Sequence, residues 1–123
     1  MGTDTTLGES FARALGAKDF DRVGQLLHEE VDFRGLTPGR SWTAQGADRV
    51  VGEVLTRWFE PDDEIEQVQE VQTGAFADRA RVGYRFAGRN GDGPFVVEQQ
   101  AYYAERDGRI GWMRIVCSGF RPA

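Results

Sequence analysis

The stretch FVVEQQAYYAERDGRIGWMRIVC, residues 95–117, decides the fold of this chain. It contains two runs rich in β-branched and aromatic residues, separated by a short charged segment that includes Asp107-Gly108. Such runs on either side of an Asp-Gly pair predict a β-hairpin. Each arm has about eight to ten residues, which is near the upper end of usual strand length. We therefore expect the rest of the chain to cover one face of a sheet built around this hairpin.

Three helices are predicted before the main strands. Thr6 followed by Glu9 is a capping-box pattern, and apolar residues then repeat at helical spacing. Asp19 is placed to cap a second short helix. A third helix opens near Gly46, presents a wide apolar face and ends before Pro61.

The remaining segments predict strands and turns. Residues 31–36 alternate between apolar and polar, and residues 37–40 form a turn. Residues 64–76 depart from strict alternation, which predicts a β-bulge, whereas residues 81–86 alternate regularly. This order of elements predicts an α+β fold, in which one sheet carries its helices on one face.

Composition and charge restrict the class of protein. The 123 residues suit one domain, 1–123, in which residues 1–6 are expected to form a short flexible N-terminus. The net charge of −5 argues against a nucleic-acid or membrane partner, because both need clustered Lys and Arg. No apolar run approaches the roughly 20 residues of a membrane span. The single cysteine, Cys117, excludes an internal disulfide and favours a cytoplasmic location.

Three short segments lie at the joints between the predicted elements: AKDFD at 17–21, LLHEEVDF at 26–33 and DGRI at 107–110. With the order of elements from Leu7 to Phe120, they resemble the nuclear transport factor 2-like superfamily. Within it they resemble the SnoaL-like branch, which includes polyketide cyclases and ketosteroid isomerases. The resemblance implies a cone: a curved, mixed or antiparallel sheet with three N-terminal helices on its concave face. It further implies an internal pocket and, commonly, a homodimer through the outer face of the sheet.

The resemblance also allows the isomerase residues to be sought one by one. The tyrosine that donates to the oxyanion corresponds to Phe11, and the aspartate that shuttles the proton corresponds to Gly35. The protonated aspartate corresponds to Ala101, or to Gln100 if the last turn is one residue longer. Enolisation needs both a base and a stabilised oxyanion. Only the Gln100 alternative leaves a hydrogen-bond donor, and an amide cannot act as the acid. The isomerase mechanism is therefore not expected.

Strand parity divides the candidate residues between two faces, with the resemblance placing Met113, Ile115 and Cys117 inside. The predicted ligand-binding residues are Arg40, Trp42, Trp58, Tyr84, Phe86, Gln99, Tyr103, Met113 and Cys117. The predicted dimer-interface residues are Arg85, Glu98, Gln100, Tyr102, Trp112 and Arg114. An exposed Trp112 would be costly on a monomer, which favours a homodimer through this face.

Two functions remain open. In the first, the pocket binds a small apolar or aromatic metabolite, with Tyr84 or Tyr103 as proton donor if the protein is a cofactor-free isomerase, cyclase or hydrolase. In the second, the same aromatic side chains fill the core of a non-catalytic dimerisation or interaction module. Arg40 either clamps a ligand carboxylate near the mouth of the cone or is a surface residue.

No cofactor and no metal site are predicted. The acidic run between Asp62 and Glu66 is interpreted as a solvated turn, and Cys117 as an inert buried thiol. His28, the only histidine, is expected in a solvated or helix-capping position at the end of the second helix.

Overall fold

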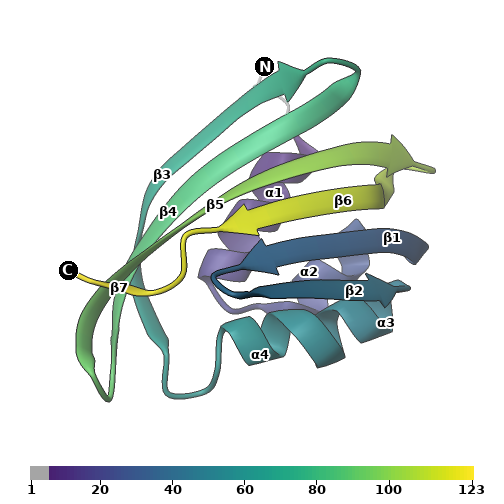
Figure 1. Cartoon of the computed structure of the whole chain (residues 1–123). Helices are drawn as coiled ribbons and strands as arrows, with labels where there is room; N and C mark the ends of the chain where they lie inside the picture. Colours follow the sequence, from purple (N-terminus) through teal and green to yellow (C-terminus); the bar gives the residue numbers. More distant parts are fainter. Residues whose placement is uncertain (1–5) are drawn as a thin grey trace.

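The computed structural model describes residues 6–123, which form helices and one sheet (Figure 1). The helical segments are α1 (Leu7–Gly16), α2 (Phe20–Leu26), α3 (Ala47–Arg49), the π-helix η1 (Val50–Leu55) and α4 (Thr56–Trp58). The strands are β1 (Leu27–Thr37), β2 (Arg40–Gln45), β3 (Glu64–Phe76), β4 (Arg79–Asn90), β5 (Gly93–Arg106), β6 (Arg109–Cys117) and β7 (Arg121–Pro122). Because α3, η1 and α4 follow one another directly, the chain has the three predicted helices. The α+β prediction is confirmed.

The first two helices begin at the predicted caps. The Thr6 hydroxyl accepts a hydrogen bond from the backbone N–H of Glu9 at 3.1 Å. The Asp19 carboxylate caps α2 in the same way. The Glu9 carboxylate pairs with Arg13 one turn further on, at 3.1 Å, so no reciprocal capping-box bond is observed. Thr6 thus belongs to the start of α1, and the rest of the predicted N-terminal segment 1–6 lies outside the described residues.

The sheet has the strand order β2-β1-β6-β5-β4-β3, and β7 pairs with the start of β5. Strands β1 and β6 run parallel, and all other neighbours are antiparallel. Figure 1 shows α1 and α2 behind the sheet and the third helical run along its β2 edge. We call the side facing the helices the inner face and the opposite side the outer face. None of the described helices is long and apolar enough to cross a membrane.

The hairpin predicted from residues 95–117 lies at the centre of the sheet. It joins β5 to β6, with Arg106 opposite Arg109. Asp107 and Gly108 both have positive φ, +53° and +79°, as a type I′ turn requires. Because β6 then pairs with β1, the end of the chain holds its first strand in place.

The prediction around the first strand is wrong in extent. Strand β1 begins at Leu27 instead of residue 31, and Arg40–Gln45 forms a second strand that the sequence analysis did not predict. The turn at 37–40 is therefore the tip of a hairpin. Strand β2 is short and lies at the sheet edge, and Trp42 and Ala44 are its only apolar residues. Such a strand carries a weak sequence signal because pairing with β1, not burial, orders it.

The position expected for His28 is also wrong. The residue belongs to β1 rather than to the end of α2, and it is only 7% exposed. Its Nδ1 accepts a hydrogen bond from the backbone N–H of Glu30 at 3.0 Å. Its Nε2 lies 3.4 Å from the Asp107 carboxylate in the β5–β6 turn. His28 therefore links the first strand to the last hairpin and neither faces solvent nor caps a helix.

Strand parity was predicted correctly. The inward residues of β4, β5 and β6 are all buried: Val82, Tyr84, Phe86, Val97, Gln99, Ala101, Tyr103, Met113, Ile115 and Cys117. The predicted outward residues are all half-buried or exposed. Strand β3 contains the expected irregularity as two register shifts, one at Ile65/Gln67 and one at Val68/Glu70.

Candidate functional site

The structure places most predicted ligand-binding residues together on the inner side of the sheet. Trp58, Tyr84, Phe86, Gln99, Tyr103, Met113 and Cys117 are each less than 9% exposed. The aromatic rings contact one another and Phe11, a residue the sequence analysis did not include in the lining. Tyr84 stacks on Phe86 at 5.1 Å and meets Phe11 edge-on at 6.4 Å. The inner side is thus an aromatic layer closed to solvent.

A hydrogen-bonded pair of polar side chains lies within this layer. The Tyr84 hydroxyl donates a hydrogen bond to Gln99 Oε1 at 2.5 Å, between neighbouring strands. Gln99 is 1% exposed, and its Nε2 has no hydrogen-bond partner among the described residues. The indole Nε1 of Trp58, a residue 8% exposed, also has none in that part of the chain. Because buried N–H groups are almost always paired, these two donors are exceptions that call for a partner.

Burial raises the pKa of Tyr84 well above its usual value of 10, and the nearby Cys117 adds to the effect. The phenol therefore stays protonated at neutral pH and donates a hydrogen bond. A general acid works best when its pKa lies near the operating pH, so this shift makes Tyr84 a poor acid catalyst.

The raised pKa of Tyr84 makes the free energy of unfolding fall at alkaline pH. The unfolded chain releases the Tyr84 proton near pH 10, whereas the folded chain keeps it. The contribution of the protonated Tyr84 phenol to stability is fully present below pH 10. Above pH 10 it decreases by about 1.4 kcal/mol per pH unit, until Tyr84 also ionises in the folded chain. From about pH 10 to pH 11, the free energy of unfolding should therefore fall less in Tyr84→Phe than in the parent protein. Urea denaturation across this range measures the difference, and parallel pH profiles would contradict it.

The phenol of Tyr103, the other candidate proton donor, bonds to the backbone of α1. The Tyr103 oxygen accepts a hydrogen bond from the backbone N–H of Gly8 at 2.9 Å. It thereby satisfies one of the free N–H groups at the start of α1. A Cβ at Gly8 would lie 2.7 Å from this phenol, so the contact needs glycine there. Tyr103 thus holds α1 against β5.

Arg40, Trp42 and Trp58 form a continuous path from the surface to the interior. The Arg40 guanidinium is exposed and lies 3.7 Å from the ring centre of Trp42. The half-buried Trp42 ring meets Trp58 edge-on at 6.1 Å, and its Nε1 donates to the Thr37 hydroxyl at 2.9 Å. Arg40 is therefore a surface residue stacked on the outermost indole.

The positions that correspond to the isomerase residues carry no acid or base. Phe11 and Ala101 are fully buried. At Gly35, a Cβ would lie 2.6 Å from the Trp58 ring, so that ring occupies the space a carboxylate would need. Gln100 lies on the outer face and accepts a hydrogen bond from Arg81 at 3.0 Å. Ala101 is thus the inward residue of this pair.

Most of the acidic run after α4 is exposed, as expected for a solvated turn, and Asp63 is the buried exception. Glu60, Asp62 and Asp63 bring their carboxylates close together. Asp63 is 8% exposed and accepts hydrogen bonds from the Glu60 backbone N–H and the Asn90 side chain, both at 3.0 Å. These bonds give Asp63 a structural role in closing the turn.

Solved structures with the same architecture come from several kinds of protein. No protein-family model matches the chain, and no curated protein matches its sequence. A proposed polyketide cyclase from Xanthomonas campestris is 20% identical, with a TM-score of 0.68 over 89% of this chain and 86% of that one. An LEH-like epoxide hydrolase from M. tuberculosis is 21% identical, with a TM-score of 0.65 over 91% and 80%.

A third similar structure holds a small molecule. It is a hypothetical protein from Catenulispora acidiphila with a ketosteroid isomerase-like fold, in complex with trimethylamine. It is 15% identical, with a TM-score of 0.66 over 94% of this chain and 88% of that chain. The chain has the nuclear transport factor 2-like fold. The nuclear transport factor 2-like fold carries isomerase-like, cyclase and hydrolase proteins alike, so function must be argued from the residues of the site.

Proposed function

We propose that this chain binds a compact, largely apolar molecule between the inner face of the sheet and the helices. An oxygen of that molecule accepts hydrogen bonds from Gln99 Nε2 or Trp58 Nε1. The observation that carries the proposal is the pair of buried N–H donors without partners. An unpaired buried donor costs about 1–3 kcal/mol, which an acceptor on a ligand would recover.

The surrounding residues set the character of this ligand. Aromatic rings and Met113 favour an apolar body, and they fill enough of the interior to require a small one. We place the entrance at Trp42, because its half-buried ring lies between exposed Arg40 and buried Trp58. Tyr84 orients Gln99 through its hydrogen bond and takes no part in proton transfer. Binding, rather than catalysis, is therefore the activity proposed.

Two molecules of nearly the same shape test the proposal. Cyclohexanone carries the required acceptor oxygen, and methylenecyclohexane has a CH₂ group in its place. In ¹⁵N spectra, cyclohexanone should shift the Gln99 side-chain amide and the Trp58 indole N–H signals and bind at least about fivefold more tightly. Gln99→Met should reduce that preference. Equal binding of both probes, or no shift of either N–H signal, would overturn the proposal.

Native mass spectrometry of the purified protein, with organic extraction of the same sample, complements this test. A stoichiometric small molecule that carries an acceptor oxygen would support the proposal and give the class of compound. If no small molecule is found and neither cyclohexanone nor methylenecyclohexane binds, the second candidate function is favoured, an interaction module with a filled core.

The outer face supports that second candidate. Leu36 is 54% and Val116 50% exposed, and the two lie opposite each other on β1 and β6. They adjoin the predicted dimer interface, which contains half-buried Tyr102 and Trp112. Exposed apolar residues grouped in this way favour association of two copies.

The dimer has its own test by native mass spectrometry. Val116→Lys places a charge in the proposed interface and should convert a dimer to a monomer. Gln25→Lys, on the exposed side of α2, adds the same charge away from the sheet and should leave the dimer intact. A parent protein that is monomeric at micromolar concentration would contradict the interface.

A further inference from the structure

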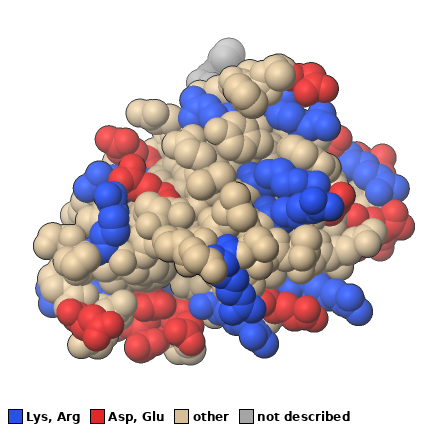
Figure 2. All heavy atoms as spheres, in the orientation of Figure 1, with Lys and Arg blue, Asp and Glu red and all other residues tan. Residues whose placement is uncertain are grey.

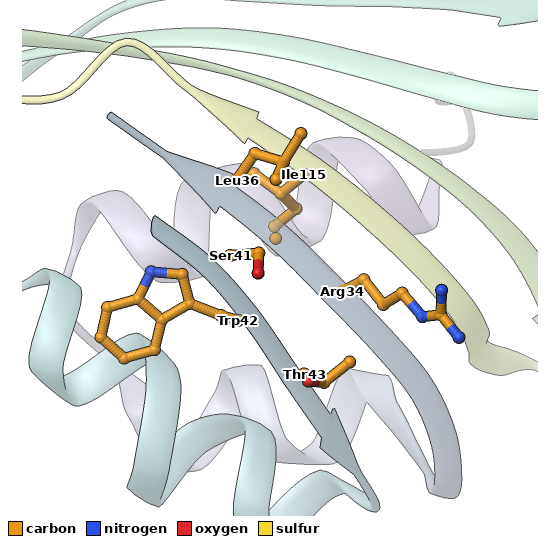
Figure 3. A pocket seen from close by; sticks show the side chains of 7 residues that line it. Arg34, Leu36, Ser41, Trp42, Thr43 and Ile115 are labelled. Atoms are coloured by element: carbon orange, nitrogen blue, oxygen red, sulfur yellow. The ribbon is translucent and has the colours of Figure 1, made fainter. Parts of the chain in front are cut away.

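A hollow lies on the outer face, on the side of the sheet opposite the proposed interior site. It has a volume of about 340 Å³ and extends over β2, β1 and β6 (Figure 3). Its walls are the outward side chains of Arg34 and Leu36 on β1 and of Ser41 and Thr43 on β2. Ser41 lies opposite Leu36, and Thr43 opposite Arg34. The hollow forms because the short side chains of Ser41 and Thr43 on β2 lie beside the longer side chains of Leu36 and Arg34 on β1.

The floor of the hollow is the sheet itself. Gly35, Trp42 and Ile115 lie between the wall residues and belong to the opposite parity. Trp42 points toward the helical layer in Figure 3, where it meets Trp58. The hollow is therefore separate from the interior and has a rigid base of paired strands.

The hollow carries one positive charge, that of Arg34. Arg34 makes no ion pair or hydrogen bond with any residue that the structure describes, and the same holds for the Ser41 and Thr43 hydroxyls. The next arginine on this face, Arg114, is satisfied by Asp32 at 3.2 Å. Figure 2 shows basic side chains in the middle of this face and most acidic ones toward its edges. On a chain of net charge −5, a free guanidinium here makes a local anion-attracting region.

We propose that this hollow binds a small carboxylic acid with a short apolar body. A guanidinium matches the geometry of a carboxylate and can hold it with two hydrogen bonds. The Ser41 and Thr43 hydroxyls lie across the strand pair and can donate to the same group. Leu36, which is 54% exposed, contacts the apolar part. The volume is at the lower end of the range for small-molecule sites, so the ligand is small.

Hexanoate tests the site, with hexanol and inorganic phosphate as matched probes. Hexanol lacks the charge, and phosphate lacks the apolar chain. In ¹⁵N spectra of the full chain, hexanoate should give saturable shifts at the Ser41 and Thr43 amides. Hexanol and phosphate should each bind at least about fivefold more weakly. Equal binding by either one would overturn the proposal, as would the absence of saturable shifts.

Two substitutions test whether Arg34 binds the hexanoate carboxylate. Arg34→Gln should weaken hexanoate binding by about fivefold to tenfold, because it removes the charge and keeps hydrogen-bonding capacity. Arg81→Gln, on the same face but bonded to Gln100, is the control and should bind as the parent does. An equal loss of hexanoate affinity in both variants, or no loss in Arg34→Gln, would overturn the proposal. The Gln99 and Trp58 N–H signals report the interior site separately, so either proposal can fail alone.

Discussion

Replacing Phe86 by alanine is expected to lower the free energy of unfolding by about 3–5 kcal/mol. Phe86 is fully buried on the inner face of β4. Its ring contacts Phe59 at 6.0 Å and Tyr84 at 5.1 Å. A Cβ at Gly16 would lie 3.0 Å from this ring, so the end of α1 also rests on it. Removing the ring therefore leaves a cavity where the end of α1 and Phe59, just after α4, meet the sheet.

Phe76→Ala is the matched control for this substitution. Phe76 is 68% exposed at the end of β3, and its one aromatic contact within residues 6–123 is Tyr102 at 5.7 Å. Its loss should cost about 1 kcal/mol or less. Urea denaturation of both variants, analysed by linear extrapolation, gives the two values. Similar losses in the two variants would mean that Phe86 is not the centre of the core.

The buried pair Tyr84 and Gln99 should give the second large effect. Tyr84→Phe removes the only hydrogen-bond partner that the structure shows for the Gln99 side chain, which leaves the whole side-chain amide unpaired in the core. We expect a loss of about 1–3 kcal/mol. Adding Gln99→Met removes the amide at nearly constant volume, so the double variant should recover most of this loss. The energies of the two substitutions are therefore strongly coupled, and a double-mutant cycle measures the coupling.

A second cycle serves as the control. Tyr103→Phe also removes a buried phenol oxygen, but that oxygen is bonded to the Gly8 N–H and not to Gln99. Its cost should add to that of Gln99→Met within about 0.5 kcal/mol. If both cycles are additive, the 2.5 Å bond contributes nothing specific to stability. If both show coupling, the effect comes from general repacking.

These two results also affect the proposed function. A stable double variant of Tyr84 and Gln99 would keep the fold and lack the interior hydrogen-bonding group. It should lose the preference for cyclohexanone over methylenecyclohexane that the parent protein is expected to show. Folding and ligand recognition can thus be separated in one protein, which a variant such as Phe86→Ala does not allow.

The sequence by itself determined the overall plan of this protein. Two runs rich in β-branched and aromatic residues on either side of Asp107-Gly108 predicted the central hairpin. The two-residue period of a strand divided the side chains between two faces, and the family resemblance assigned Gln99, Tyr84 and Cys117 to the inside. The structure buries all three and leaves Trp112 half-buried on the outer face. The caps at Thr6 and Asp19 are equally local, since each bonds an N–H three residues away.

Only the tertiary structure decided how these residues meet. The pairing of β2 with β1, the burial of His28 beside Asp107 and the hydrogen bond from Asn90 to Asp63 are tertiary contacts, and the last two join residues far apart in the sequence. No period reveals such partners. The same holds for both candidate sites. Gln99 and Trp58 are recognisable as unpaired donors, and Arg34 as a free cation, only after every neighbouring hydrogen bond has been assigned. Whether a polar group is satisfied is a property of the packed molecule, because each partner comes from a different strand or helix.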